Sequence, residues 1–243
     1  MLLLRHGQSE WNAIRRWQGR ADTPLTDLGR RQAALCADAL ARRAATTGRV
    51  FDTVWSSTLG RAEETATIIA GHLDLGPVST DDRWCEADAG EWEGLTPVEI
   101  ERAYPGFLTD HRRPDTFESP GDVVGRAGSV ILHIADVQRD VEGDVLVVTH
   151  SGLLRALVRH LGEPDERIPN LGGIWLDVTN DVTNDSLSGR TPDGSVIEGT
   201  AGTGIELHQR FGVEGIPITA VDAPGEDPGR EPDQSDADGD TQR

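Results

Sequence analysis

Residues 144–152 read Asp-Val-Leu-Val-Val-Thr-His-Ser-Gly, and they carry the clearest structural signal in the chain. The apolar Val-Leu-Val-Val run predicts a strand at residues 144–149 of the kind that parallel sheets bury on both faces. A helical pattern follows over residues 151–161 and ends at Gly162 and Pro164, two common helix stops. A strand that passes directly into a helix is the repeating unit of an α/β fold.

The same alternation extends over most of the chain. Further strand signals lie at residues 1–4, 53–56, 171–178 and 205–210. Helical signals lie at residues 26–45, 59–72 and 123–139, and a capping box with a proline at the first helical position marks another helix start at 96–99. Strands alternating with helices predict a three-layer α/β sandwich with a mostly parallel central sheet.

Three of the predicted strands end in polar residues. Arg5-His6 follows the first strand, Ser56-Ser57 the second, and Thr149-His150 the strand at 144–149. In parallel sheets ligands bind beyond the carboxyl ends of the strands. We therefore expect two histidines and nearby arginines, far apart in sequence, to meet at one rim of the sheet.

The composition excludes several classes of function. The formal net charge of -19 argues against a nucleic-acid partner or binding to an anionic membrane, because either requires a basic face. The chain has no lysine, so all 23 basic residues are arginine. This excludes a lysine Schiff base, pyridoxal phosphate included, and a lysine-bearing phosphate loop. A phosphate site in such an acidic chain must concentrate positive charge locally.

The 243 residues fit one domain with appendages. We predict a domain over residues 1–221, with a hairpin or mobile insertion at about 180–198, and a disordered acidic tail at 222–243. No segment approaches the roughly 20 apolar residues that span a bilayer, and the N-terminus does not resemble a signal peptide, so we expect a cytoplasmic protein. Cys36 and Cys85 lack disulfide or metal-ligand spacing and are expected to be ordinary buried thiols.

Residues 5–12 read Arg-His-Gly-Gln-Ser-Glu-Trp-Asn, and Trp-Gln-Gly follows at 17–19. An isolated Arg-His-Gly tripeptide would be weak evidence, but its surroundings are informative. The segment resembles the N-terminal signature of the histidine phosphatase (phosphoglycerate-mutase-like) superfamily, whose core is Arg-His-Gly-x-(Ser/Thr)-x-x-Asn. The resemblance implies the phosphoglycerate-mutase-like fold and phosphoryl transfer through a phosphohistidine.

Three further blocks resemble the same superfamily, in the same order. Ser-Ser-x-x-Gly-Arg-Ala at 56–62 is similar to the block with an essential arginine. Glu86, followed by Gly-Glu-Trp-Glu-Gly-Leu at 90–95, is similar to the block with the acid. Thr-His-Ser-Gly at 149–152 is similar to the block with the second histidine, although His-Gly is usual there. Together the four blocks cover about residues 1–161.

The residue types suit phosphoryl transfer on physical grounds. His6 is a competent acceptor because an imidazole with a pKa near about 6.5 is largely neutral at pH 7. Its other ring nitrogen should be held by a backbone carbonyl at the Gly7 turn. The transferred group passes through a loose transition state, so catalysis is mostly positioning and positive charge. Arg5, Arg61 and a protonated His150 are expected to supply that charge.

The remaining site residues are expected to add donors and a proton. Asn12 and Gln18 would contribute neutral hydrogen-bond donors to the phosphate, as the resemblance also implies, and Ser151 is expected to bind the phosphate beside them. Glu86 would donate a proton to the leaving alkoxide and then act as base for the water that cleaves phospho-His6. No clustered carboxylates of a metal-binding type accompany these residues, so we expect neither a metal ion nor a cofactor.

Several assignments stay open. Asp88, Glu91 and Glu93 compete with Glu86 for the role of the acid, and Arg83 competes with Arg61. The tryptophans that flank the motifs could pack the wall of the site or stack on a substrate; they are Trp11, Trp17, Trp84 and Trp92.

We expect a phosphomonoesterase that hydrolyses a small phosphorylated metabolite. One alternative is a cofactor-dependent phosphoglycerate mutase, although mutases usually carry a longer basic insertion before the second histidine. Here Arg112-Arg113 is the only adjacent basic pair in that stretch. A second alternative is an inactive phosphate-binding module, a class that typically loses His6 or the acid.

The substrate class rests on resemblance. Residues 5–18 resemble actinobacterial members that act on glucosyl-3-phosphoglycerate or other sugar and glycerate phosphates. Ribazole phosphate, phosphohistidine proteins and broad specificity stay open as substrates, and a homodimer is compatible with the sequence.

Overall fold

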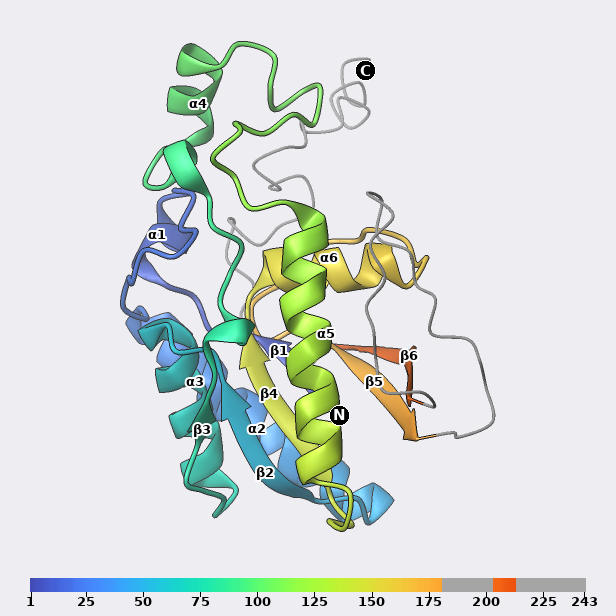
Figure 1. The fold of residues 1–243 in the computed structure, drawn as a ribbon. Coiled ribbons are helices and arrows are strands. Elements are labelled where there is room, and N and C mark those ends of the chain that lie inside the picture. The colour runs from blue at the N-terminus through green and yellow to red at the C-terminus, as the bar shows by residue number, and fades with distance from the viewer. Residues whose placement is uncertain (181–202, 213–243) are drawn as a thin grey trace, which may run out of the picture.

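A six-stranded sheet forms the centre of the protein, in the strand order β3-β2-β4-β1-β5-β6 (Figure 1). The computed structural model describes residues 1–180 and 203–212. The strands are β1 (Leu2–Arg5), β2 (Phe51–Ser56), β3 (Ser79–Thr80), β4 (Asp144–Thr149), β5 (Gly173–Asn180) and β6 (Thr203–Phe211). The four strands β1 to β4 pair in parallel, whereas β5 pairs antiparallel with β1 and with β6. The predicted mostly parallel sheet is confirmed.

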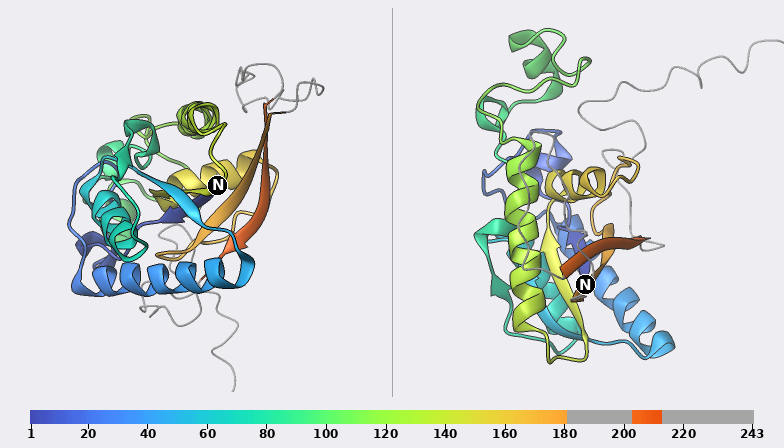
Figure 2. Two further views of the ribbon diagram at one scale, coloured as in Figure 1. Left: turned by 90° about the horizontal axis from the view of Figure 1, so that it is seen from below. Right: turned by 45° about the vertical axis from the view of Figure 1, so that its right-hand side comes forward.

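Helices cover both faces of this sheet (Figures 1 and 2). On one face lie α2 (Asp27–Thr47) and α3 (Gly60–His72), and on the other lie α5 (Pro120–Val137) and α6 (Ser151–His160). The shorter elements are α1 (Glu10–Ala13), the 3₁₀ turns η1 (Asp82–Trp84) and η2 (Gly90–Trp92), and α4 (Pro97–Ala103). The resulting three layers confirm the predicted sandwich.

The apolar strands feed two separate cores because successive side chains point to opposite faces of a sheet. Leu2 and Leu4 of β1 pack with α2 and α3, whereas Leu3 packs with α5 and α6. Leu146 and Val147 of β4 divide between the two cores in the same way. A central strand covered on both faces must be apolar throughout, which explains the continuous run in the sequence.

Several of the helices begin at residues whose side chains cap them. Thr26 accepts a hydrogen bond from Gly29 N at the start of α2. Thr96 and Glu99 form a reciprocal capping box at the start of α4, as the sequence predicts. A small third core beside α4 contains the fully buried Trp92.

Some predictions fall beyond the described part of the chain. The hairpin or insertion at 180–198 lies outside it except for Asn180, and so does the acidic tail at 222–243. Within residues 1–180 and 203–212, no helix has the length and apolar character to cross a membrane. Cys36 and Cys85 are buried free thiols, as expected.

Candidate active site

The two motif histidines meet at the carboxyl ends of β1 and β4. These strands run in register, with Arg5 beside Thr149, so the residues that follow them emerge side by side. His6 N donates to Thr149 O at 3.0 Å. The ring centroids of His6 and His150 lie 5.1 Å apart, and both rings are almost fully buried. The predicted convergence of the two imidazoles at one rim is therefore present.

A backbone carbonyl orients the His6 ring. Its Nδ1 lies 2.6 Å from Gly7 O, so Nδ1 carries the hydrogen and Nε2 presents a lone pair. Gly7 itself is held by a bond from its N–H to Thr65 Oγ1 at 3.1 Å. A Cβ at position 7 would lie 2.6 Å from Gly29 O, so this turn requires glycine. The geometry suits nucleophilic attack by Nε2.

Burial lowers the pKa of His6 well below its usual 6.5, and the nearby charges of Arg61 and Arg5 lower it further. Both effects disfavour a cation in this position. His6 is therefore neutral at pH 7, as a nucleophile must be.

His150 differs from the sequence prediction. Burial lowers its pKa well below 6.5, followed by the charges of Arg61 and His6, so the ring is neutral and not protonated. Within the described residues, neither of its ring nitrogens has a hydrogen-bond partner. The sequence could not show that the ring is buried or that Arg61, Arg126 and Arg5 come close enough to disfavour its protonated form. A bound phosphate dianion would favour protonation of His150.

Arg61 at the start of α3 is a fixed, buried cation. Its Nη1 donates to Ala21 O at 2.6 Å and its Nη2 to Gly19 O at 2.9 Å. Burial lowers its pKa, opposed by Glu86 and Asp22, but an arginine stays protonated at neutral pH. Its buried Nε has no hydrogen-bond partner in the part of the chain that the structure describes. Buried donors of this kind suit an anionic ligand.

The competing Arg83 is engaged elsewhere. Its guanidinium forms an ion pair with Asp81 at 2.7 Å and donates to Ser129 Oγ at 3.0 Å. The structure thus favours Arg61 as the cation of the site.

A loop that the sequence analysis missed supports Arg5 and His6. Arg5 Nη1 donates to Ile168 O at 2.9 Å. The buried Asn170 donates from Nδ2 to His6 O at 2.8 Å and lies 3.4 Å from Asn12 Oδ1. No local pattern distinguishes Asn170, because its partners lie more than 150 residues away in sequence.

The predicted neutral donors are oriented by the protein. Asn12 Oδ1 accepts from Ser9 N, which closes the capping box of α1. Gln18 Oε1 accepts from Ser9 Oγ at 2.8 Å and from Thr23 Oγ1 at 2.7 Å. Both amide oxygens are thus occupied, and the NH₂ groups are the ends that could donate to a phosphate. Ser151 is half-buried and begins α6 directly after His150.

Glu86 lies against the first turn of α6. Its Oε2 accepts from Gly152 N at 3.0 Å, and its Oε1 accepts from Leu153 N at 3.0 Å and Ala87 N at 2.9 Å. The first N–H groups of a helix lack partners within the helix and favour a carboxylate. This contact places the Glu86 side chain beside the helix that begins directly after His150.

The other acidic candidates are engaged away from α6. Asp88 accepts from Gly90 N, Glu93 accepts from Arg20 N and Ala21 N, and Glu91 lies near Thr116 Oγ1. Glu86 is therefore the acid that fits the site best.

Two of the tryptophans that flank the motifs lie in the protein interior. Trp84 and Trp92 are fully buried, and Trp17 packs edge-on against Trp92 with centroids 5.1 Å apart. The Trp11 ring lies close to Gly94. Burial of Trp84 and Trp92 indicates wall packing for these two rings. Among residues 1–180 and 203–212, no group of three or more His, Cys, Asp or Glu side chains is placed to hold a metal ion.

A family model described as the histidine phosphatase superfamily (branch 1) matches residues 1–176. The chain belongs to this superfamily. The histidine phosphatase is 36% identical over 208 residues to the glucosyl-3-phosphoglycerate phosphatase of Mycolicibacterium vanbaalenii, covering 79% of this chain and 89% of the relative. It is 34% identical over 169 residues to phosphoserine phosphatase 1 of Hydrogenobacter thermophilus, covering 65% and 73%.

A solved structure supports the same assignment. The mycobacterial glucosyl-3-phosphoglycerate phosphatase in complex with VO3 superposes on the histidine phosphatase with a TM-score of 0.64 and 30% identity. The match covers 72–73% of this chain in the structures of that enzyme and 90% of the VO3 complex. Both the fold and the superfamily expected from the sequence are confirmed.

Proposed function

We propose that this histidine phosphatase hydrolyses the phosphate monoester of a small phosphorylated metabolite through a phosphohistidine on His6. The observation that carries the proposal is the 5.1 Å approach of the His6 and His150 rings, with Nδ1 of His6 held by Gly7 O. This arrangement leaves Nε2 of His6 as the nucleophile. The phosphatase names of the relatives support the same chemistry.

In the first step, Nε2 of His6 attacks phosphorus and the bond from phosphorus to the ester oxygen breaks. Arg5, Arg61 and His150 hold the equatorial oxygens, where the charge of a loose transition state resides. Asn12, Gln18 and Ser151 add neutral hydrogen bonds. Glu86 must bind a proton, although the N–H groups of α6 favour its carboxylate, and it gives that proton to the departing oxygen. The products are an alcohol and phospho-His6.

In the second step, water attacks the phosphoryl group and the bond from phosphorus to nitrogen breaks. Glu86, now a carboxylate, accepts the proton from that water. His6 returns to its neutral form and inorganic phosphate leaves. General acid–base catalysis of this kind contributes about 10²- to 10⁴-fold to a rate.

For the substrate we propose glucosyl-3-phosphoglycerate. The relatives that carry this name in their titles include two with 36% and 32% identity, and the alignments extend over 89% of their length. Phosphoserine is the second candidate, because a relative with 34% identity is named for it. The proposal includes a cytoplasmic enzyme that acts as a homodimer without a nucleic-acid partner.

The mutase alternative finds little support in the adjacent basic pair. Arg112 stacks on Phe107 at 4.1 Å and forms an ion pair with Asp110 at 3.2 Å. The Arg113 guanidinium lies 5.1 Å from the ring of Trp17. Both side chains are thus held by the protein. The inactive-module alternative is disfavoured because His6 and Glu86 are both in place.

The test is a phosphoenzyme trap combined with a substrate panel. Wild-type enzyme mixed with labelled substrate and quenched should yield an acid-labile, base-stable phosphoprotein, and His6→Gln should yield none. His72→Gln, which removes an exposed histidine, is the matched control and should behave as wild type.

The panel compares phosphate release from glucosyl-3-phosphoglycerate, phosphoserine and 3-phosphoglycerate, and it follows interconversion of 2- and 3-phosphoglycerate. Full turnover by His6→Gln would refute the nucleophile. Interconversion faster than phosphate release would favour the mutase.

A further inference from the structure

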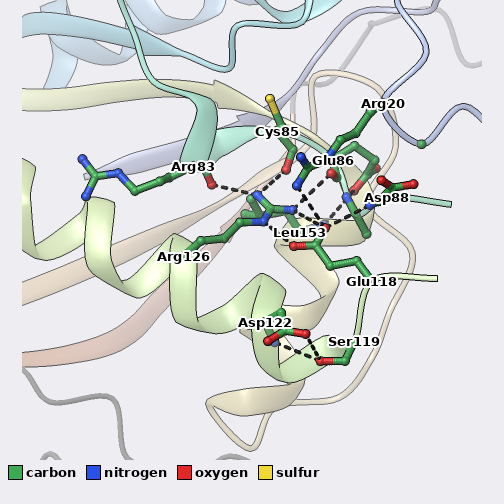
Figure 3. A network of polar contacts seen from close by, with 12 residues as sticks. Arg20, Arg83, Cys85, Glu86, Asp88, Glu118, Ser119, Asp122, Arg126 and Leu153 are labelled. Atoms are coloured by element: carbon green, nitrogen blue, oxygen red, sulfur yellow. Dashed lines mark hydrogen bonds and ion pairs between the residues drawn. The ribbon is translucent and has the colours of Figure 1, made fainter. Parts of the chain in front are cut away.

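Arg126 of α5 lies next to the main chain of Glu86 (Figure 3). It falls outside the four sequence blocks. Its guanidinium donates to three main-chain carbonyls of the segment that carries the acid. Nη1 donates to Arg83 O at 2.8 Å and Cys85 O at 2.6 Å, and Nη2 donates to Glu86 O at 3.1 Å. The bonded carbonyls thus lie within residues 83–86, and only that of Trp84 is not among them.

The same guanidinium forms a bidentate ion pair with Glu118. Nε lies 2.7 Å from Oε1 and Nη2 lies 3.0 Å from Oε2, and both side chains are nearly buried, with 14% and 13% exposed. Glu118 Oε2 also accepts from Asp88 N at 3.0 Å, and Glu118 N donates to Asp88 O at 2.9 Å. The ion pair therefore holds the main chain on both sides of Glu86.

The contacts continue toward Arg61. Glu118 Oε2 lies 3.5 Å from Arg20 Nη2, and Arg20 follows Gly19, whose carbonyl accepts from Arg61 Nη2. Glu93 accepts from the N–H of Arg20 and so supports this loop from its other side. One polar network therefore supports both the acid and the main phosphate-binding cation.

The position of Glu86 depends on this network because little regular structure surrounds it. The preceding turn η1 contains three residues, and the segment after it is not helical until η2. Hydrogen bonds to α6 hold the Glu86 carboxylate, and Arg126 holds its main chain. A displacement of about 1 Å at a reacting group can cost about 100-fold in rate.

We propose that Arg126, locked by Glu118, is a positioning residue for proton transfer by Glu86. The inference rests on the proposed role of Glu86 as the acid. Arg126 acts on Glu86 through the main-chain carbonyls of Arg83, Cys85 and Glu86. Its loss should impair the departure of leaving groups that need a proton more than the departure of those that do not.

The test compares two esters of similar shape. Phenolate leaves poorly without a proton, whereas p-nitrophenolate leaves readily. kcat/KM reports the steps up to release of the phenol, so the later hydrolysis of phospho-His6 does not enter. Arg126→Gln should lower kcat/KM for phenyl phosphate about 10- to 100-fold, and for p-nitrophenyl phosphate less than about threefold.

Three further variants make the comparison decisive. Arg126→Lys keeps the charge but not the planar fork, so it should recover only part of the loss. It also replaces Arg126→Gln if that variant does not fold, as judged by circular dichroism. Arg83→Gln removes a neighbouring guanidinium that pairs with Asp81, and any change in kcat/KM should be equal for the two esters. Glu86→Gln should show the largest difference between the esters.

The outcomes distinguish a failure of the positioning role of Arg126 from a failure of the proposed role of Glu86. If Glu86→Gln lowers kcat/KM equally for both esters, Glu86 is not the acid and the proposed mechanism fails. If Glu86→Gln discriminates between the esters but folded Arg126→Gln and Arg126→Lys do not, the mechanism stands and the positioning role of Arg126 is wrong.

Discussion

The two buried imidazoles predict a specific loss of stability on acidification. His6 and His150 are 3% and 0% exposed, and burial with nearby arginines lowers the pKa of each well below 6.5. Between that lowered pKa and 6.5, the unfolded chain binds protons that the folded protein does not. Stability is therefore fully present above pH 6.5 and falls as the pH decreases below it.

The magnitude follows from proton linkage. If an imidazole stays neutral in the folded protein, moving from pH 7.5 to pH 5.5 costs about 1 kcal/mol of unfolding free energy per histidine. The pair should thus contribute about 2–3 kcal/mol to the loss over this range. The carboxylates with lowered pKa values, such as Asp81 and Asp165, titrate below this range and do not enter the comparison.

The assay is urea unfolding at pH 7.5 and 5.5 in phosphate-free buffer. The loss between the two pH values should be smaller in His150→Gln by about 1 kcal/mol, and in His6→Gln/His150→Gln by about 2–3 kcal/mol. His72→Gln removes an exposed ring, and it is the matched control. An equal pH dependence in wild type and His150→Gln would show that the pKa of His150 is not lowered in the folded protein.

Two further predictions concern residues around the site. In Gly152→Ala the new Cβ would lie 2.5 Å from Glu86 Oε1, so kcat/KM for phenyl phosphate should fall about 10- to 100-fold, whereas Gly125→Ala, with open space at its Cβ, should leave it unchanged. Asn170→Ala should lower the urea-unfolding free energy by about 1–3 kcal/mol, because it leaves His6 O buried without its Nδ2 donor; a smaller loss would mean that another group satisfies that carbonyl.

The main sheet and the catalytic rim could be predicted from the sequence because their signals are local. β1 and β4 are apolar runs, and each is followed at once by a histidine. The carboxyl ends of parallel neighbours meet at one edge, so this pattern was sufficient to bring His6 and His150 together. The helices differ from their predicted bounds by only a few residues for the same reason.

Short or unpatterned elements could not be predicted in this way. β3 has two residues and α1 has four, too few to show a period. The antiparallel direction of β5 beside β1 is also a matter of chain path, since an apolar strand fits either direction. The resemblance selects Glu86 among four nearby acids, but the hydrogen bond that it accepts from Gly152 N, 66 residues further along the chain, is visible only in the structure.

The sequence by itself determined which groups are candidates for the chemistry: two histidines at strand ends, an arginine that opens a helix, and an acid in a block of known type. The tertiary structure alone decided the protonation states of these groups and the contacts that hold them in place. His150 is neutral because Arg61 and burial act on it together. Arg126 and Asn170 matter because they donate to main-chain carbonyls of residues distant in sequence. Every residue has such a carbonyl, so no sequence pattern marks which one a distant side chain will bind.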